Sequence, residues 1–343
     1  MNHAVILAGG MGTRFWPLSR LKNAKQFIRL IDNKSFLEHT IDRVGTIIDI
    51  PHVWIVGNKD QETQLREHAS QINQNQTLLE PCGKNTAACI AWAAFELLKK
   101  DPDAIMIVLP SDHMISPNKA FADTISTALQ IVHNQDVLIT IGIPPTFANT
   151  AYGYIETTQK NAVSLPVMAF HEKPNKETAE AYLKKGHFYW NSGIFIWKAA
   201  TILEQIKHHL PNLYAALKTG IDTNTSIPDI YPTLDSISID YGIMEKSAHI
   251  TQVIPASFTW SDIGSWTALN DFLPKDPHNN ASETNVIAHN SHDNIIHAPG
   301  KTVALIGIDN LIVVDTPDAL LIVQKCHDQD VKSIMSQLPN SLK

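Results

Sequence analysis

Residues 4–14 read AVILAGGMGTR, a run of apolar side chains that ends in a cluster of glycines. The apolar part, Ala4–Leu7, is typical of a short buried strand, and the glycines predict a loop where that strand stops. Gly9, Gly10 and Gly12 allow the backbone to approach an anion closely and to point amide hydrogens at it. The stretch therefore predicts a strand that leads into an anion-binding loop.

Two cationic side chains accompany these glycines. Arg14 offers a planar fork of donors for phosphate oxygens, and Lys25 can reach another phosphate as a point charge. A Walker loop is excluded because Thr13 and Arg14, and not Lys followed by Ser or Thr, come after Gly12. The GxGxxG dinucleotide pattern also has no match, which disfavours an oxidoreductase. A generic strand-to-loop turn would not explain the two cations, so we predict a phosphate loop of another kind.

The composition sets limits on size and partners. A chain of 343 residues can hold one large core with an appendage, or two modest domains. Hydrophobic residues make up 44% and charged residues 18%, which is typical of a globular protein. The formal net charge of -7 argues against general nucleic-acid binding, which depends on clustered Lys and Arg. It does not argue against a small anionic ligand, for which a few cations suffice.

The sequence also predicts a cytoplasmic protein. The first ten residues contain no basic segment followed by a long apolar run, so we expect no signal peptide. The longest apolar runs, such as Val303–Ile308, are far shorter than the ~20 residues of a membrane helix, so we expect no membrane partner. Three irregularly spaced cysteines favour reduced thiols over a disulfide framework.

Apolar runs and helical periodicities alternate up to residue 143. The pattern predicts strands at Ala4–Leu7, Val53–Val56, Ala104–Leu109 and Val137–Ile143, and helices at Ser35–Ile48, Lys59–Gln71, Thr86–Lys100 and Phe121–His133. Continuous apolar strands between helices imply an α/β fold with a doubly wound, mostly parallel sheet. Ligands bind at the carboxyl ends of such strands. The candidate positions are therefore the polar residues after each strand, Gly9–Arg14, Ser111–His113 and Tyr152–Glu156.

The pattern changes twice further along the chain. From about residue 150 we expect strands at Ala151–Thr157, Val167–Glu172 and Trp190–Trp197, and helices at Lys176–Lys185, Ala199–Leu217 and Tyr241–Ser247. Residues 284–323 form short β-rich runs separated by turn residues, and a helix at Val331–Leu338 follows. We therefore predict a catalytic domain over residues 1–275 and a β-rich C-terminal domain over residues 280–343.

Several of these segments resemble the motifs of the sugar nucleotidyltransferase family. Residues 7–20, LAGGMGTRFWPLSR, together with Lys25-Gln-Phe27, resemble its nucleotide loop, and the FWPLSR form is similar to that of the mannose-1-phosphate guanylyltransferases. Further matches follow in order at Glu80–Thr86, Leu109–His113, Tyr152–Glu156, Phe170–Pro174, Trp190–Phe195, Ile239–Lys246 and Trp260–Trp266. The resemblance runs from residue 4 to about residue 335.

The resemblance implies a Rossmann-like nucleotidyltransferase domain with a short left-handed β-helix-like tail that can support a homodimer. It also implies transfer of GMP from GTP to α-D-mannose 1-phosphate, with Mg²⁺, giving GDP-mannose and pyrophosphate. A phosphate monoester has a second pKa of about 6 and is largely dianionic at neutral pH, so the attack on the α-phosphorus requires no general base. It requires neutralised charge and two anions held in line. Because the chain ends without the isomerase domain of longer relatives, we expect one activity.

The resemblance assigns the triphosphate and metal to specific residues. The nucleotide is expected at Leu7, Ala8, Gly9, Gly10, Gly12, Thr13, Arg14, Lys25, Glu80, Asn85, Thr86 and Asp112. The catalytic residues are expected to be Arg14, Lys25, Asp112 and Asp262, with Asp112 and Asp262 as the Mg²⁺ ligands, since this ion favours oxygens and takes few protein ligands. The alternative for Asp112 is a turn or helix N-cap. Thr86 is equally compatible with an N-cap, and which group accepts from guanine stays open.

The sugar phosphate is expected at Gly153, Glu172, Lys173 and Asn191. In this assignment Lys173 holds the phosphate, Glu172 accepts from sugar hydroxyls, and the other two lie against the ring. A solvated surface pair and a turn residue are the alternatives for Glu172–Lys173 and Asn191. Two rival functions stay open: the same chemistry on another sugar 1-phosphate, such as manno-heptose or glucose, and a regulatory homologue that binds without catalysis. The intact Arg14 and Lys25 argue against the second.

Overall fold

The computed structural model of the chain describes residues 1–10, 12–20, 23–158, 162–223 and 227–342. The chain forms two compact units. Unit 1 comprises residues 1–9, 40–111 and 115–260, and unit 2 comprises residues 10–39, 112–114 and 261–343. The units do not follow a boundary near residue 280, because the glycine-loop segment groups with the C-terminal residues. The domain boundary expected from the sequence stays a prediction.

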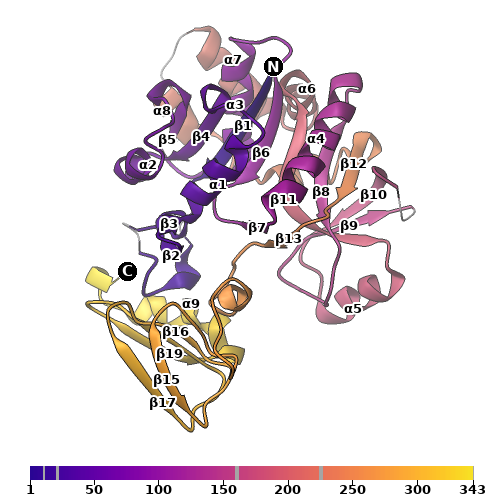
Figure 1. Cartoon of the computed structure of the whole chain (residues 1–343). Helices are drawn as coiled ribbons and strands as arrows, with labels where there is room; N and C mark the ends of the chain where they lie inside the picture. Colours follow the sequence, from indigo (N-terminus) through magenta and orange to yellow (C-terminus); the bar gives the residue numbers. More distant parts are fainter. Residues whose placement is uncertain (11, 21–22, 159–161, 224–226, 343) are drawn as a thin grey trace. The chain divides into compact units, whose positions relative to one another are not determined.

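A mixed sheet forms the centre of unit 1. In the described part of the chain it has nine strands in the order β5-β4-β1-β6-β11-β8-β12-β10-β9 (Figure 1). They are β1 (Asn2–Ala8), β4 (Val53–Asn58), β5 (Thr77–Glu80), β6 (Ile105–Pro110), β8 (Leu138–Ile143), β9 (Tyr154–Thr157), β10 (Leu165–His171), β11 (Phe188–Lys198) and β12 (Thr251–Pro255). The strands β5, β4, β1 and β6 are parallel neighbours, whereas β11 runs antiparallel to β6 and β8. The α/β class is confirmed, and β5 and β12 lie where the sequence pattern predicts no strand.

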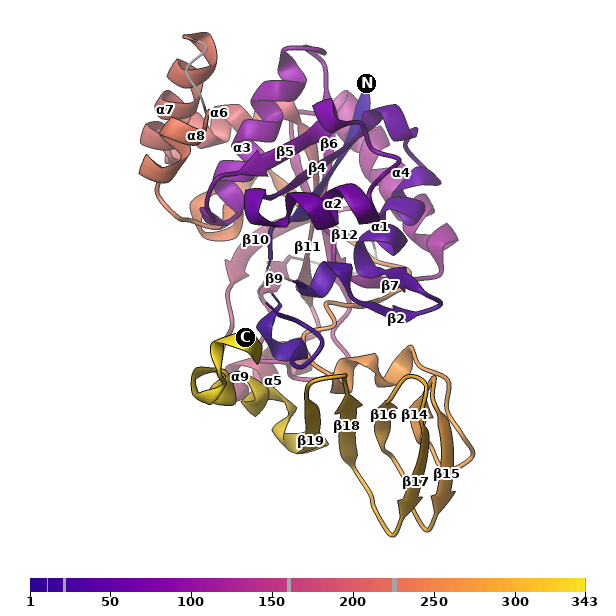
Figure 2. The same cartoon turned by 90° about the vertical axis from the view of Figure 1, so that its left-hand side faces the viewer.

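Helices cover both faces of this sheet, with α3 and α6 on one face and α1 and α4 on the other (Figure 2). The helices are α1 (Phe36–Gly45), α2 (Glu62–His68), α3 (Asn85–Leu98), α4 (Asn118–Asn134), α5 (Lys176–Lys185), α6 (Ala199–His209), α7 (Pro211–Asp222) and α8 (Ile227–Ile230). Every residue of β8 is buried. A strand that is covered on both faces has a nearly continuous apolar sequence, and for this reason β8 could be predicted from the sequence.

Some predicted helices have different bounds. The stretch Ala199–Leu217 is divided into α6 and α7, because Pro211 lacks an N–H and begins a new helix. Residues Lys59–Gln61 form the 3-10 turn η4, and α2 follows directly. The stretch Tyr241–Ser247 is a π-helix, η7 (Asp240–Met244). Single π turns occur frequently at functional sites.

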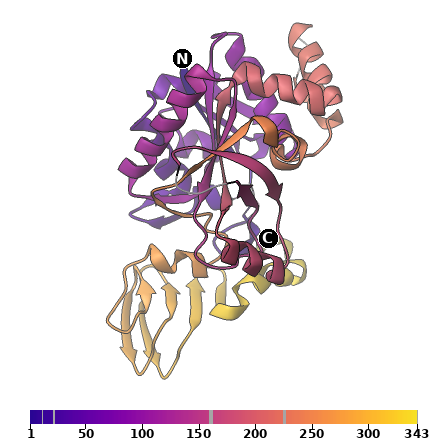
Figure 3. The same ribbon diagram turned by 90° about the vertical axis from the view of Figure 1, so that its right-hand side faces the viewer.

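The C-terminal part of unit 2 consists of short strands in stacked coils (Figure 3). One sheet has the order β14-β16-β18-β19, and β15 pairs with β17. The strands are β14 (Ala281–Ser282), β15 (Asn285–His289), β16 (Ile295–His297), β17 (Thr302–Ile306), β18 (Leu311–Asp315) and β19 (Leu320–Gln324). The pairs β14–β16, β16–β18 and β15–β17 are parallel, which confirms a β-helix-like tail. Inside it, the buried Asn294 donates through Nδ2 to Asn280 Oδ1 over 2.9 Å.

The rest of unit 2 packs the glycine-loop segment onto C-terminal side chains. A hairpin joins β2 (Arg29–Ile31) and β3 (Lys34–Ser35), and α1 then begins after Ser35, whose Oγ accepts from Glu38 N. One apolar core contains Phe15, Trp16 and Trp266 together with Val331. The expected helix Val331–Leu338 consists of α9 (Val331–Ile334) and the 3-10 turn η11 (Met335–Gln337), preceded by η10 (Lys325–Asp330).

Two short strands, β7 (Met114–Ser116) and β13 (Thr259–Ser261), coincide with points in the sequence where the chain passes from one unit to the other. The remaining 3-10 turns of the described residues are η1 (Thr13–Phe15), η2 (Lys25–Phe27), η3 (Ile50–His52), η5 (Gln74–Gln76), η6 (Tyr231–Thr233), η8 (Ala248–Ile250), η9 (Thr267–Asp271) and η12 (Asn340–Leu342). None of the helices in the described ranges has the length and apolar character to span a bilayer.

Candidate active site

The glycine loop has a specific steric reason for glycine at position 12. Gly12 has a φ of 58°, in the left-handed region that favours glycine. A Cβ atom at this position would lie 2.2 Å from the Cβ of Lys25. Phe15 N donates to Gly12 O over 3.2 Å and closes the turn η1, while Phe15 itself is buried. Gly12 therefore lets the backbone of the loop pack directly against Lys25.

Lys25 is buried and bridges two aspartate residues of unit 2. Its Nζ donates to Asp112 Oδ2 over 2.7 Å and to the backbone oxygen of Asp262 over 2.5 Å. Burial works to raise the pKa of the Asp112 carboxyl, but the charges of Lys25 and His113 outweigh it and hold this pKa below its usual value. Asp112 is thus an anion at neutral pH, and its role as a metal ligand stays a prediction.

These groups line a pocket of about 300 Å³ within unit 2. Its lining comprises Gly12, Arg14, Phe15, Lys25, Asp112, His113, Asp262, Ile263, Gly264 and Lys332. The four residues predicted to be catalytic therefore lie together around one cavity. Asp262 Oδ1 accepts from Gly264 N over 3.0 Å, which fixes the turn that presents this carboxylate. Arg14 is exposed.

The pocket fits a small divalent cation in the chemistry of its donors. Asp112 and Asp262 supply carboxylate oxygens, the ligand type that Mg²⁺ prefers. Within the described ranges, no group of three or more His, Cys, Asp or Glu side chains is arranged to hold a metal. A pair of carboxylates suits an ion that takes its remaining ligands from phosphate and water.

The start of the predicted nucleotide loop belongs to unit 1. Leu7 O accepts from Ser111 N over 3.0 Å, and Ala8 is buried at the end of β1. A Cβ on Gly9 would lie 3.0 Å from Glu80 Oε2. Gly10, in unit 2, is exposed and has open space around its Cα. The side chain of Thr13 lies outside the described residues.

Glu80 is held inside unit 1 at the end of β5. It is buried, and Tyr231 Oη donates to its Oε1 over 2.6 Å. Burial raises the pKa of Glu80 to about 7, although the hydrogen bond from Tyr231 works in the opposite direction. The carboxyl is therefore shared between its two protonation states near neutral pH, and its other oxygen lies beneath Gly9.

The other two residues of the Glu80–Thr86 segment that are expected to bind the nucleotide differ in exposure. Asn85 is exposed with a φ of 63°, and its Oδ1 accepts from Thr86 N over 2.9 Å. Thr86 Oγ1 accepts from Ile239 N over 2.8 Å. The position before α3 is occupied by Lys84, so the N-cap alternative for Thr86 is wrong. Its hydroxyl instead ties the start of α3 to the segment that precedes η7.

The four predicted sugar-phosphate residues gather in unit 1. Asn191 N donates to Gly153 O over 2.8 Å, and a Cβ on Gly153 would lie 2.5 Å from Glu172 Oε2. Lys173 donates to Glu172, and this bond is the main cause that raises the pKa of Lys173. The side chain of Lys173 is exposed, and its φ is 45°. Because Gly153 has no side chain, it leaves the space that the Glu172 carboxylate occupies.

A carboxylate with no assigned role completes this group. Asn191 Nδ2 donates to Asp240 Oδ1 over 2.7 Å, while Asn191 Oδ1 accepts from Gly193 N over 3.1 Å. The orientation of the Asn191 amide is therefore fixed by hydrogen bonds at both its nitrogen and its oxygen. Burial raises the pKa of Asp240 to about 6, and the negative charge of Glu172 acts in the same direction. A carboxyl with a raised pKa beside a second carboxyl is typical of a functional site.

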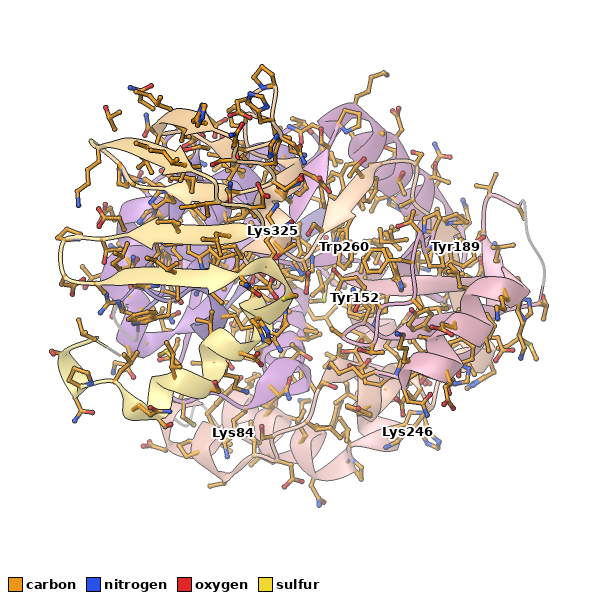
Figure 4. All side chains as sticks on the ribbon, turned by 90° about the horizontal axis from the view of Figure 1, so that it is seen from below. Lys84, Tyr152, Tyr189, Lys246, Trp260 and Lys325 are labelled. Atoms are coloured by element: carbon orange, nitrogen blue, oxygen red, sulfur yellow. The ribbon has the colours of Figure 1, made fainter. Side chains whose placement is uncertain are left out.

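An aromatic cluster lies in the same unit. The ring of Tyr152 contacts the rings of Trp190 and Trp260, with centroids 5.2 Å apart in both cases. Figure 4 shows Tyr152 and Trp260 side by side. Such edge contacts fix the orientation of the Tyr152 ring between the two tryptophan rings. Tyr152 directly precedes Gly153, and Trp190 directly precedes Asn191, so the cluster positions the backbone of two predicted sugar-site residues.

The sequence assigns no role to Tyr231, Asp240 and Lys332, although all three belong to these sites. Asp240 belongs to the motif Ile239–Lys246, so its presence there was a usable signal. Tyr231 and Lys332 lie outside every motif, and no periodicity or spacing marks them. Only the three-dimensional arrangement connects Tyr231 to Glu80 and Lys332 to the glycine loop.

Comparison with known families gives matches over nearly the whole chain. The family model described as nucleotidyl transferase matches residues 3–279. A second model, described as a MannoseP isomerase/GMP-like beta-helix domain, matches residues 284–338. The first match contains every predicted site residue, and the second contains Lys332.

Individual relatives agree with these models. The mannose-1-phosphate guanylyltransferase of Klebsiella pneumoniae is 37% identical over 347 residues, which cover 97% of this chain and 73% of the relative. The alginate biosynthesis protein AlgA of Pseudomonas fluorescens is 37% identical over 350 residues, covering 97% and 71%. A crystal structure from Thermus thermophilus, described as a mannose-1-phosphate geranyltransferase, has 32% identity and a TM-score of 0.91, and covers 98% of each chain. The chain therefore belongs to the nucleotidyl transferase family, in the group of the mannose-1-phosphate guanylyltransferases.

Proposed function

We propose that the chain transfers GMP from GTP to α-D-mannose 1-phosphate and releases pyrophosphate. The observation that carries this proposal is the assembly of Arg14, Lys25, Asp112 and Asp262 around one pocket at the glycine loop. Cations beside two carboxylates suit a metal-bound polyphosphate better than a neutral ligand. The identity of the sugar and of the base is supported by the names of relatives such as the Klebsiella enzyme.

The proposed chemistry uses charge and position. The sugar phosphate oxygen attacks the α-phosphorus, a new P–O bond forms, and the bond to the β-phosphate oxygen breaks. Pyrophosphate leaves with the electron pair of that bond. Arg14 and Lys25 would balance the negative charge of the triphosphate, and Lys173 would hold the attacking phosphate. Charge stabilisation by fixed cations is the main contribution that proteins make to phosphoryl transfer.

Asp112 and Asp262 would hold Mg²⁺ in this proposal. When bound, the ion supplies charge neutralisation to the phosphate oxygens. Lys25 would act beside it, since its Nζ already contacts both aspartate residues and is held in place by Gly12. The protein side of the site is therefore ordered by direct contacts among these residues.

The base would be read at Glu80–Thr86. Guanine offers donors at N1 and at its amino group, so an acceptor is required. Glu80 is an acceptor when it is ionised, but it is also engaged by Tyr231. Asn85 is exposed and can offer backbone groups to a ligand. On the sugar side, Glu172 and Asn191 would contact the hydroxyl groups of the hexose.

A matrix of substrates tests this function. Each of GTP, ATP, UTP and dTTP is mixed with each of mannose, glucose and manno-heptose 1-phosphates, and pyrophosphate release is measured with Mg²⁺. We expect release with GTP only, fastest with mannose 1-phosphate. Release that is fastest with another sugar phosphate would favour the rival substrate. Binding of GDP-mannose without release from any pair would favour the regulatory homologue.

The proposal extends to a homodimer through the β-rich tail. β19 is one of the two edge strands of its sheet in the described residues, and two of its apolar side chains, Leu320 and Ile322, are 56% and 60% exposed. An exposed apolar edge is a place where a second strand can pair. We expect sedimentation to give a dimer, and Ile322→Lys to shift it towards the monomer. A wild-type monomer at micromolar concentration would contradict this part.

A further inference from the structure

Lys332 lies on the wall of the glycine-loop pocket, although it belongs to the C-terminal helix α9. It follows the last β-strand by several residues and is far from the loop in sequence. The same cavity is lined by Arg14, Lys25 and the two aspartate residues of the proposed metal site. All of these residues belong to unit 2. Lys332 thus adds a third cation to a pocket for which the sequence predicts two.

The position of Lys332 is fixed by its neighbours in the fold. Val331 is 2% exposed and packs in the core that contains Phe15 and Trp16 of the glycine loop. Ile334 and Met335 pack against the same core from the next turn. The buried Asp328 accepts from Thr267 N over 3.2 Å and anchors the preceding turn. α9 also contacts η1 directly. The backbone that carries Lys332 is therefore held against the loop.

The three cations of the pocket are not equivalent. Lys25 is buried and already donates to Asp112 and to Asp262 O. Arg14 and Lys332 are both exposed, and within the described ranges neither is engaged in an ion pair or hydrogen bond. An ammonium or guanidinium with free donors on a pocket wall can bind phosphate oxygens. Lys25 already donates to one carboxylate and one backbone oxygen, so it mainly organises those groups.

The charge of the pocket favours an occupant with several negative charges. Three cations face two carboxylates, and a divalent cation held by those carboxylates would increase the positive excess. The three cationic and two anionic side chains alone sum to +1, and a bound divalent cation would raise this sum to +3. A monoanion would leave that loaded pocket with excess positive charge, whereas a polyphosphate matches it. We infer that Lys332 binds the β- and γ-phosphates of the nucleoside triphosphate, the part that leaves as pyrophosphate. This inference rests on the proposed function and assigns the C-terminal helix a direct contact with substrate.

The variant Lys332→Met tests this inference, because it removes the charge and keeps most of the side-chain length. A hydrogen bond to a charged group corresponds to about a tenfold change in binding. We expect KM for GTP, and KM for pyrophosphate in the reverse reaction, to rise about tenfold. KM for the sugar 1-phosphate should not change, since that substrate lacks the leaving phosphates. Lys332→Arg should restore most of the loss.

The control is Lys301→Ala, which removes the same charge from an exposed lysine of unit 2 outside the pocket. It should leave all three KM values unchanged. Unchanged KM for GTP and pyrophosphate in Lys332→Met would overturn the inference, and so would an equal rise for all substrates together with a lower melting temperature.

A wild-type protein that releases no pyrophosphate would instead refute the proposed function. In that case, calorimetry with inorganic pyrophosphate and Mg²⁺ still tests Lys332, because loss of binding in the variant is expected in either event.

Discussion

The Nζ atom of Lys25 lies 2.7 Å from Oδ2 of Asp112, across 87 positions of sequence. The lysine is almost fully buried, while about a third of the aspartate side chain is exposed. The ion pair therefore has one protected end and one end that opens into the pocket. Such an arrangement keeps the carboxylate ionised and available, because the lysine cannot move away without leaving a charge buried.

Asp112→Ala should abolish turnover and reduce stability moderately. It removes a proposed metal ligand and the carboxylate partner of Lys25. Because Asp112 is partly exposed and Lys25 keeps its bond to Asp262 O, we expect a loss of about 1–3 kcal/mol in the free energy of unfolding. Pyrophosphate release with Mg²⁺ and urea denaturation measure the two effects. Asp309→Ala, an exposed aspartate outside the pocket, is the control. Wild-type rates in Asp112→Ala would refute the metal assignment.

The same ion pair predicts a contribution to acid stability. The pKa of Asp112 is held below its unfolded value, so its stabilising contribution is present at neutral pH. This contribution is lost as the pH falls below the pKa of Asp112 in the unfolded chain and then through its lower pKa in the folded protein. We expect the stability difference between wild type and Asp112→Asn to shrink progressively on acidification. A difference that is the same at pH 7 and at pH 3 would show that the pair makes no such contribution.

Gly12→Ala should disrupt the position of Lys25. The new Cβ would lie 2.2 Å from Lys25 Cβ and would sit on a backbone with positive φ. The left-handed conformation alone disfavours alanine by roughly 1–2 kcal/mol. We expect kcat/KM for GTP to fall roughly a hundredfold, because the whole loop must shift and misplace the groups that hold the substrate. Gly300→Ala separates the two causes, since its φ is 77° but nothing lies within 4 Å of the added atom. It should lose some stability and keep full activity.

The sequence predicts the glycine loop, but it reveals only one of the two physical reasons for glycine there. Glycines beside Arg14 indicate an anion site, but the contact between Gly12 and Lys25 depends on a fold of the segment that no periodicity encodes. The pairing of Lys25 with Asp112 likewise cannot be predicted from the sequence. Lys25 belongs to the glycine-loop segment and Asp112 to the end of a distant strand, and no pattern connects the two. The strands β1, β6 and β8 were predictable because burial on both faces makes them continuously apolar. β5 was not, because Thr77–Glu80 is short and ends in a charged residue.

Asp240→Asn should weaken binding of the sugar phosphate selectively. The carboxylate accepts from Asn191 Nδ2 and lies near the charges of Glu172 and Lys173. With an amide in its place, Asn191 Nδ2 exchanges a charged acceptor for a neutral one, so the orientation of the Asn191 amide is held less firmly. We expect KM for mannose 1-phosphate to rise about tenfold, with KM for GTP unchanged. Asp235→Asn, on the exposed segment nearby, is the matched control. A rise in KM for GTP of the same size would contradict a role confined to the sugar side.

Glu80→Gln should remove a pH dependence of stability that the buried carboxyl imposes. The folded-state pKa of Glu80 is raised to about 7 from an ordinary value of 4.5. The folded protein therefore binds this proton more tightly than the unfolded chain does, and the associated stability is fully present below pH 4.5. It is lost as the pH rises through 7. The shift corresponds to roughly 3 kcal/mol at most, so wild type should lose up to that amount relative to Glu80→Gln between pH 4.5 and 8.

Tyr231→Phe provides the complementary test of the same carboxyl. The Tyr231 hydroxyl donates to Glu80 Oε1 over 2.6 Å and favours the ionised form, so its removal should raise the pKa of Glu80 further. The window in which stability is lost should then move to higher pH than in wild type. Urea denaturation of wild type, Tyr231→Phe and Glu80→Gln across pH 4.5 to 9 measures both effects. Groups that titrate in all three proteins contribute equally to each free energy of unfolding, so their contributions cancel when two proteins are compared. If the difference between wild type and Glu80→Gln were constant with pH, Glu80 would not carry a proton in the folded protein, and the hydrogen bond from Tyr231 would hold a permanent anion beneath Gly9.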